Sequence, residues 1–239
     1  MARSLRLFIP NVPCHIIQRG NNRTRIFLSM EDYQFFLEVL QEAQLKHPCQ
    51  LYSYCLMPNH FHLIVNPQQT GNVSLFMKLL GGKYVRYFNK KYDRTGTLWE
   101  NRFRSFLIGG ERYFIRCLRY VETNPVRSGL AKTPESYQWS SYNYRAFGAN
   151  SSLLNIDPWF ISLGTTITEC RLIYAQFIKE SIEESELEQL RQIAKRGGIF
   201  ADKHFKEYVG EYYKMDITRR YPGRPKRIVT PKKSLFTCQ

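Results

Sequence analysis

Two short apolar stretches, residues 51–57 and 61–65, stand on either side of the dipeptide Pro58-Asn59. Both have the length and the aromatic content of β-strands, and two residues between strands are enough for a hairpin turn. A hairpin is an antiparallel pair, so the chain must build an antiparallel sheet around it. The remaining elements have to extend that sheet and cover its apolar surface.

Further strand and helix signals surround the hairpin. Strands are predicted at residues 14–19 and 99–108, and helices at residues 29–47, 73–92 and 111–123. Ser29 and Asp32 resemble a capping box at the start of the first helix, and Pro48 and Pro125 end the first and the last helix. The order β-α-β-β-α-β followed by a helix is the ferredoxin-like pattern. The sequence therefore predicts an α+β fold with an antiparallel sheet and helices packed on one side.

The pattern becomes less regular after Gly148. We predict a main domain at residues 1–150, a helical extension at residues 151–217 and a basic flexible tail at residues 218–239. Within the tail, Arg224 lies in the sequence Pro-Gly-Arg-Pro, which resembles the core of the AT-hook, a short basic arm that enters the minor groove. A simple solvated tail is the alternative.

The chain is strongly basic. It has 35 Lys and Arg against 20 Asp and Glu, a formal charge of +15, which favours a polyanionic partner such as nucleic acid. The sequence contains no apolar run that could span a bilayer and no apolar signal core, so we expect a cytoplasmic, nucleoid-associated protein and no membrane partner. The six cysteines include no C-x-x-C pair, which argues against a zinc ribbon and for reduced thiols.

A His-Phe-His sequence begins the second strand of the hairpin. Side chains alternate along a strand, so His60 and His62 project from the same face. Two imidazole nitrogens in this arrangement can hold one divalent ion. A packed or surface histidine pair is the alternative.

The predicted helix at residues 111–123 carries a second candidate feature. At helical spacing, Tyr113, Arg116 and Tyr120 share one face, which we expect to be free for a substrate. The opposite face is apolar and is expected to pack on the sheet. Glu122 points away from the tyrosine face, which favours a surface carboxylate.

A tyrosine hydroxyl has an ordinary pKa of about 10 and is a weak nucleophile near neutral pH. A metal bound to a phosphate would neutralise the charge that develops on the phosphate oxygens and would align the phosphorus for attack. The histidine pair could hold the metal while a tyrosine attacks. Most of the 16 tyrosines in the chain must nevertheless serve packing or solubility.

Together these motifs resemble a known family. His60-Phe61-His62 resembles the HUH motif, and Tyr120, four residues before Asn124-Pro125-Val126-Arg127, resembles the tyrosine helix of the REP-associated tyrosine transposases and related single-tyrosine insertion-sequence transposases. The sequences HIIQRGNNR at residues 15–23 and GTLWENRFRS at residues 96–105 are also similar to that family. The resemblance covers roughly residues 8–150, in the family's order.

The resemblance implies a fold, a reaction and a site. The fold is the HUH endonuclease fold over residues 1–150, and the reaction is cleavage and rejoining of single-stranded DNA at hairpin-bearing ends through a 5′-phosphotyrosine. It implies Tyr120 as the nucleophile, His60 and His62 as ligands of Mg²⁺ or Mn²⁺, and Asn124 as the candidate third ligand. No nucleotide cofactor is implied. Some relatives are homodimers that exchange the tyrosine helix and others are monomers, so both states stay open.

Single-stranded DNA also needs a basic surface. The candidate DNA-binding residues are Arg19, Arg23, Arg25, Lys83, Arg86, Arg102, Arg104 and Arg224. Trp99 and Phe103 share a face by alternation, and a core role is expected for both. The alternative functions are a host-adopted DNA-binding protein of the same fold, a replication-type HUH nickase and a simple metallohydrolase that does not need the tyrosine. The extension could help to recognise the DNA end.

Overall fold

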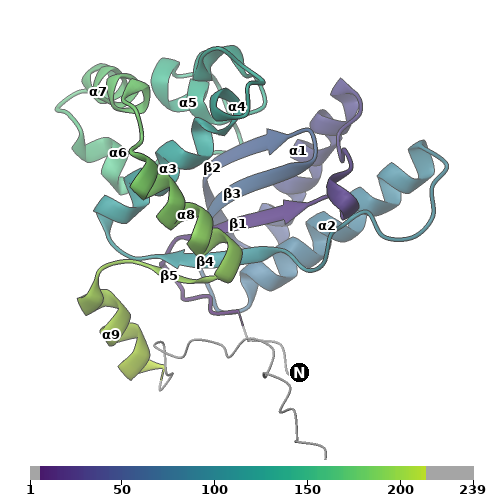
Figure 1. The fold of residues 1–239 in the computed structure, drawn as a ribbon, viewed down its shortest axis with the longest axis horizontal. Coiled ribbons are helices and arrows are strands. Elements are labelled where there is room, and N and C mark those ends of the chain that lie inside the picture. Colours follow the sequence, from purple (N-terminus) through teal and green to yellow (C-terminus); the bar gives the residue numbers. More distant parts are fainter. Residues whose placement is uncertain (1–5, 214–239) are drawn as a thin grey trace, which may run out of the picture.

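The computed structural model describes residues 6–213, which form a five-stranded sheet between two layers of helices (Figure 1). The strands are β1 (Cys14–Arg19), β2 (Cys49–Met57), β3 (His60–Pro67), β4 (Arg104–Ile108) and β5 (Gly198–Phe200). Their order across the sheet is β2-β3-β1-β4-β5. The pairs β2–β3, β3–β1 and β1–β4 are antiparallel, whereas β5 is parallel to β4. The predicted α+β class is confirmed, with a mixed sheet.

The helices cover both faces of the sheet. They are α1 (Met30–Lys46), α2 (Asn72–Lys91), α3 (Glu111–Glu122), α4 (Asn124–Arg127), α5 (Tyr142–Phe147), α6 (Pro158–Ser162), α7 (Ile167–Lys179), α8 (Glu184–Arg196) and α9 (Lys203–Tyr212), with 3-10 turns η1 (Asn21–Arg23) and η2 (Pro134–Ser136). The two helices of the ferredoxin-like pattern, α1 and α2, pack together on one face, as predicted. A second layer of helices, which the prediction of helices on one side did not include, covers the opposite face, because α3, α5, α7 and α8 bury their own apolar residues there.

Alternation along β3 assigns the histidines to the α3 face. Phe61 and Leu63 belong to the apolar core beneath α1 and α2, whereas Ile64 belongs to the core beneath α3. Because successive side chains point to opposite faces, His60 and His62 lie on the same side as Ile64. The predicted sharing of a face by the two histidines is confirmed.

The hairpin turn between β2 and β3 is held by the chain that precedes α1. The carbonyl oxygen of Pro58 accepts a hydrogen bond from the backbone N–H of Ile26 at 2.7 Å, and that of Asn59 accepts one from Gly20 at 2.9 Å. The predicted capping box at Ser29 and Asp32 is present at the start of α1. The two hydrogen bonds to Pro58 and Asn59 fix the turn that precedes His60, the first residue of β3.

The extended segment predicted at residues 99–108 is shorter in the structure, where β4 spans Arg104–Ile108. Asn101 has a φ of 62°, a left-handed conformation that interrupts an extended chain. Trp99 packs into the core as expected, and its indole N–H donates to the carbonyl oxygen of Gly81 at 3.3 Å. The helix α2 continues through the Gly81-Gly82 pair.

The extension after residue 150 contributes to the same sheet. Its α7 and α8 lie within the residues predicted as a helical extension. The short strand β5 was not predicted. The division into domains at residue 150 remains a prediction, and the basic tail with Arg224 lies outside the described residues. Among residues 6–213, none of the helices has the length and apolar character needed to cross a bilayer.

Candidate active site

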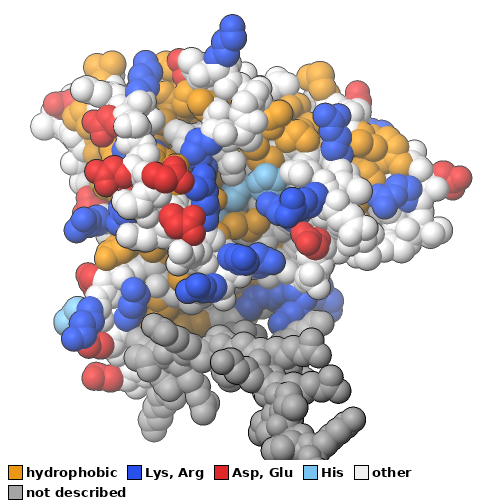
Figure 2. All heavy atoms as spheres, viewed as in Figure 1, with side chains coloured by type: hydrophobic (Ala, Val, Ile, Leu, Met, Phe, Trp, Pro, Cys, Tyr) orange, Lys and Arg blue, Asp and Glu red, His pale blue; other side chains and the backbone are white. Residues whose placement is uncertain are grey.

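The two histidines of β3 meet the end of the tyrosine helix α3. The ring centroids of His60 and His62 are 5.0 Å apart, and the ring of Tyr120 is 5.9 Å from that of His62, edge-on. On the face viewed in Figure 2, histidine side chains reach the surface near the middle, with Lys and Arg side chains around them. The structure thus brings together three of the residues that the sequence singled out.

Asn124 completes the cluster. The helix α3 ends at Glu122, as the proline after Asn124 predicts, but the short helix α4 follows directly and begins at Asn124. This break turns the Asn124 side chain toward the sheet, where its amide nitrogen lies 2.7 Å from Nε2 of His62.

The Nδ1 atoms of His60 and His62 each have a polar partner. Nδ1 of His60 lies 2.6 Å from the side-chain oxygen of Asn59, an acceptor, so His60 carries its proton on Nδ1 and leaves a lone pair on Nε2. Nδ1 of His62 lies 2.9 Å from Nε2 of His15 on β1. His15 is completely buried and was not among the predicted site residues.

His15 could have been found from the sequence only by aligning two strands. The antiparallel register pairs Ile17 with His62, and His15 is two residues along β1 on the same face. The predicted strand at residues 14–19 contained the residue, but the register that brings it to His62 comes from the fold.

All three imidazoles are held neutral. Burial, with a contribution from Arg19, lowers the pKa of His60 to about 4. Burial, together with the neighbouring histidines and arginines, lowers the pKa of His62 well below its ordinary value. Burial lowers the pKa of His15 to about 3. A neutral imidazole is the form that binds a metal ion, so His60 and His62 need not lose a proton first.

The donor set fits a divalent ion. His60 and His62 each offer a nitrogen, and Asn124 offers an amide group on the same side. The amide nitrogen of Asn124 lies 2.7 Å from Nε2 of His62, so a half-turn of the amide would bring its oxygen, the atom that can bind a metal, to that position. Within residues 6–213 no group of three or more His, Cys, Asp or Glu side chains could hold a metal ion. The candidate ligands here are two imidazoles and the amide of Asn124.

Tyr120 is a half-buried residue surrounded by positive charge. Burial raises the pKa of its hydroxyl, and Arg127, Arg191 and Arg19 oppose that rise. The guanidinium carbon of Arg127 lies 4.5 Å from the centre of the Tyr120 ring, and the same side chain donates to the Tyr120 carbonyl oxygen at 2.8 Å. A phenolate or a phosphate at this position would be next to a cation.

The tyrosine face of α3 is not as free as the sequence predicted. Arg116 forms an ion pair with Glu186 of α8 at 3.1 Å, and the ring of Tyr113 packs edge-on against Phe200 of β5 at 4.9 Å. The extension therefore covers the first part of this face, whereas Tyr120 lies at its other end beside the histidines. The prediction missed this because nothing local to α3 specifies what packs on it.

Glu122 is also not the surface carboxylate that was predicted. It is completely buried and accepts hydrogen bonds from Ser53, Ser141 and Tyr174. Arg145 donates to Glu122 at 3.2 Å and pairs with Asp157 at 2.8 Å. These partners are far from Glu122 in the sequence, so the helical position of Glu122 alone did not reveal them.

The predicted DNA-binding residues are distributed over both faces of the sheet. Arg19 is opposite His60 in the β1–β3 register, and Arg104 shares with His62 the partner Ile17, so both arginines lie on the histidine face. Exposed residues of the loops near this end of the sheet are Arg23, Arg25 and Arg102. On the other face, Lys83 of α2 pairs with Glu42 at 2.6 Å and Arg86 is exposed.

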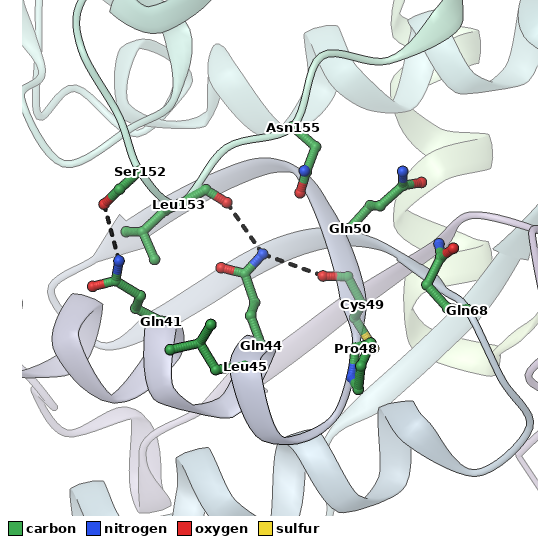
Figure 3. Close-up of a pocket in the computed structure, with 10 residues that line it drawn as sticks. All are labelled: Gln41, Gln44, Leu45, Pro48, Cys49, Gln50, Gln68, Ser152, Leu153 and Asn155. Atoms are coloured by element: carbon green, nitrogen blue, oxygen red, sulfur yellow. Dashed lines mark hydrogen bonds between the residues drawn. The ribbon is translucent and has the colours of Figure 1, made fainter.

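A cavity of about 380 Å³ lies away from the histidines (Figure 3). Its wall includes Cys49, which pairs with Pro67, whereas His60 pairs with Met57 at the opposite end of the same hairpin. The amide of Gln44 donates to the carbonyl oxygens of Cys49 and Leu153. The hydrogen bond to Leu153 links Gln44 of α1 to the chain that follows α5.

Comparison with known proteins identifies the class. Residues 9–124, which include the histidine pair, Tyr120 and Asn124, match the family described as IS200-like transposase. A Haemophilus influenzae protein named as a REP-associated tyrosine transposase is 26% identical over 134 residues, which cover 51% of this chain and 74% of that protein. The predicted family is thus confirmed.

A solved structure supports the fold. A REP-associated tyrosine transposase bound to a REP hairpin superimposes with a TM-score of 0.53 at 19% identity, over 66% of this chain and 93% of that chain. The match leaves about one third of this chain without a counterpart in that structure.

Proposed function

We propose that this transposase cuts and rejoins single-stranded DNA through a 5′-phosphotyrosine formed by Tyr120, with a divalent ion held by His60, His62 and Asn124. The observation that supports this most directly is the 5.9 Å distance between the rings of Tyr120 and His62, which come from α3 and β3 of the same chain. The proposed nucleophile and the proposed metal ligands are therefore neighbours within one chain.

The ion would be Mg²⁺ or Mn²⁺. Nε2 of His60, Nε2 of His62 and the Asn124 amide oxygen, after a half-turn of that amide, would hold it. When bound, the ion would polarise the scissile phosphate and stabilise the charge that develops on its oxygens. Two imidazoles and one amide carry no charge, so phosphate and water oxygens would complete the shell that Mg²⁺ prefers.

Tyr120 would attack the scissile phosphorus in line with the 3′ oxygen. A bond forms between the tyrosine oxygen and phosphorus, the bond from phosphorus to the 3′ oxygen breaks, and a 3′ hydroxyl is released. The phosphotyrosine retains the energy of the broken bond for rejoining, so no nucleotide cofactor is required. Arg127, 4.5 Å from the Tyr120 ring, would favour the deprotonated hydroxyl and the incoming phosphate.

The substrate would be single-stranded DNA with a hairpin near the cut. The structurally similar transposase is bound to a REP hairpin, and this chain carries a charge of +15. Arg19 and Arg104, on the histidine face, are the best placed of the candidate DNA-binding residues to contact the strand at the site. Cleavage would take place in the cytoplasm.

The test is the formation of a covalent adduct. The protein is incubated with Mn²⁺ or Mg²⁺ and labelled single-stranded oligonucleotides from the DNA that flanks its gene, then denatured. We expect an adduct that disappears with EDTA and with Tyr120→Phe. Tyr113→Phe is the matched control, because Tyr113 is on the same helix but packs against Phe200, and it should leave the adduct intact.

Two other results would contradict the proposal. Cleavage that survives Tyr120→Phe would identify a metallohydrolase that uses water instead of the tyrosine. Hairpin binding without cleavage of any flanking sequence would identify a host-adopted DNA-binding protein of the same fold.

A further inference from the structure

His15 has three close aromatic neighbours and one hydrogen bond. Its ring is completely buried, nearly parallel to the ring of His62 with 17° between the two planes, and packed against Phe106 with the ring centroids 4.8 Å apart. Nε2 of His15 is 2.9 Å from Nδ1 of His62. The ring centroids of His15 and Tyr120 are 6.3 Å apart, with the rings nearly perpendicular, so His15 lies next to both the proposed metal ligand and the proposed nucleophile.

The other nitrogen of His15 has no partner. Nδ1 is buried and makes no hydrogen bond to any of the described residues. A buried polar atom without a partner costs stability, and an aliphatic side chain of similar size would avoid that cost. The one polar contact that an imidazole gains at this position is therefore the hydrogen bond of its Nε2 with His62.

A neutral imidazole has one N–H and one lone pair, so the hydrogen bond at one nitrogen decides the state of the other. If Nδ1 of His62 donates to Nε2 of His15, then Nε2 of His62 has the lone pair and faces Asn124. If His15 donates instead, Nε2 of His62 carries a proton and cannot bind a metal. His15 can accept only when its own proton is on the unpartnered Nδ1.

We propose that His15 is a positioning residue for the metal site: it accepts the hydrogen bond of His62 Nδ1 and so orients the Nε2 lone pair of His62 toward the ion. This inference rests on the proposed metal site. Ligating histidines commonly donate their second N–H to a neighbouring acceptor, and loss of that acceptor costs about 10- to 100-fold in metal affinity. Here the acceptor is a third histidine from the adjacent strand, which is not itself a ligand.

The inference predicts different effects for two substitutions of His15. His15→Leu fills the space but offers no acceptor, and its affinity for Mn²⁺ should fall by about 10-fold or more. His15→Gln offers a side-chain oxygen near the same position and should recover most of the lost affinity. Ile64→Val is the matched control, because Ile64 is buried and directly opposite His15 in the strand register but makes no polar contact.

The experiment titrates Mn²⁺ into the DNA-free protein and measures free Mn²⁺ by electron paramagnetic resonance, with thermal midpoints recorded for every variant. The expected result is native affinity for Ile64→Val, a large loss for His15→Leu with a midpoint close to native, and recovery for His15→Gln. Native affinity in folded His15→Leu would overturn the inference and leave the metal site standing. Equal losses in both His15 variants, in step with lowered midpoints, would show a purely structural role and also overturn it.

The proposed metal site is tested separately by His60→Ala, which leaves the His15–His62 pair in place. If the native protein and His60→Ala bind Mn²⁺ equally weakly, the site itself fails, and the role of His15 fails with it. A native protein that binds and a His60→Ala variant that does not would confirm the site before the His15 variants are compared.

Discussion

The buried carboxylate of Glu122 offers a direct test of how the tyrosine helix is held. Glu122 is two residues after Tyr120, and its carboxylate is completely buried. Arg145, itself buried, donates to it at 3.2 Å and is shared with Asp157. Glu122→Gln keeps the size of the side chain and removes its charge, so Arg145 would be left with one carboxylate where it had two.

The magnitude follows from the polar contacts of the buried carboxylate. Arg145 keeps its pair with Asp157, so the loss comes from the hydrogen bonds that Ser53, Ser141, Tyr174 and Arg145 donate to the charged carboxylate, and losing a hydrogen bond to a charged group costs about 1.5–3 kcal/mol. For a chain of this size, about 1 kcal/mol corresponds to a change of about 2–4 °C in the midpoint of thermal unfolding. Glu122→Gln should therefore lower the midpoint by about 3–12 °C.

The measurement is thermal and urea unfolding followed by circular dichroism, with Glu38→Gln as control. Glu38 is an exposed residue of α1, and its substitution should change the free energy of unfolding by less than about 0.5 kcal/mol. Tyr174→Phe removes the hydroxyl that α7 donates to Glu122, and in combination with Glu122→Gln it should show non-additive losses. A loss below about 1 kcal/mol for Glu122→Gln would refute the view that this cluster joins the extension to the tyrosine helix.

Two further predictions concern the stability of the protein at low pH and the room for a Cβ atom at two glycines. Burial raises the pKa of Asp32, but hydrogen bonds led by that of Lys91 outweigh it and hold the pKa below the ordinary 3.8, so the carboxylate stabilises the fold above that pH and this contribution is lost as the pH falls through the folded value. Asp32→Asn should flatten the decline of urea stability between about pH 5 and pH 2, and an unchanged decline would contradict this. A Cβ on Gly20 would lie 2.3 Å from the carbonyl oxygen of Thr24, so Gly20→Ala should destabilise the protein by about 1–3 kcal/mol. Gly82→Ala, in a helix with its nearest contact at 3.8 Å, should instead stabilise it by about 0.5–1 kcal/mol, and equal effects of the two would refute the steric reasoning.

Much of the secondary structure could be predicted because its signals are local. The capping box, the period of α2 and the alternation in the hairpin depend on neighbouring residues, and the structure contains each of them. The strand β5 could not be predicted, since three residues that include Gly198 have no strand signal of their own. Its pairing with β4 comes from tertiary packing.

For the candidate site too, the sequence indicated the residues but not their contacts. His60 and His62 share a face through simple alternation, whereas Tyr120 and Asn124 were singled out by the resemblance to the transposase family, so the sequence indicated four residues of the cluster. Their assigned roles remain predictions. The spacing could not show that α4 turns Asn124 to within 2.7 Å of His62.

By itself the sequence determined the order of strands and helices, the common face of the histidine pair and the basic character of the chain. Only the tertiary structure decided that His15 meets His62, that Glu122 is buried among Arg145 and Tyr174, and that α8 covers part of the tyrosine face. The physical reason is that alternation and helical period act between close neighbours, whereas strand register and helix packing depend on residues tens of positions apart. The chemistry of a buried polar group is decided by those distant partners.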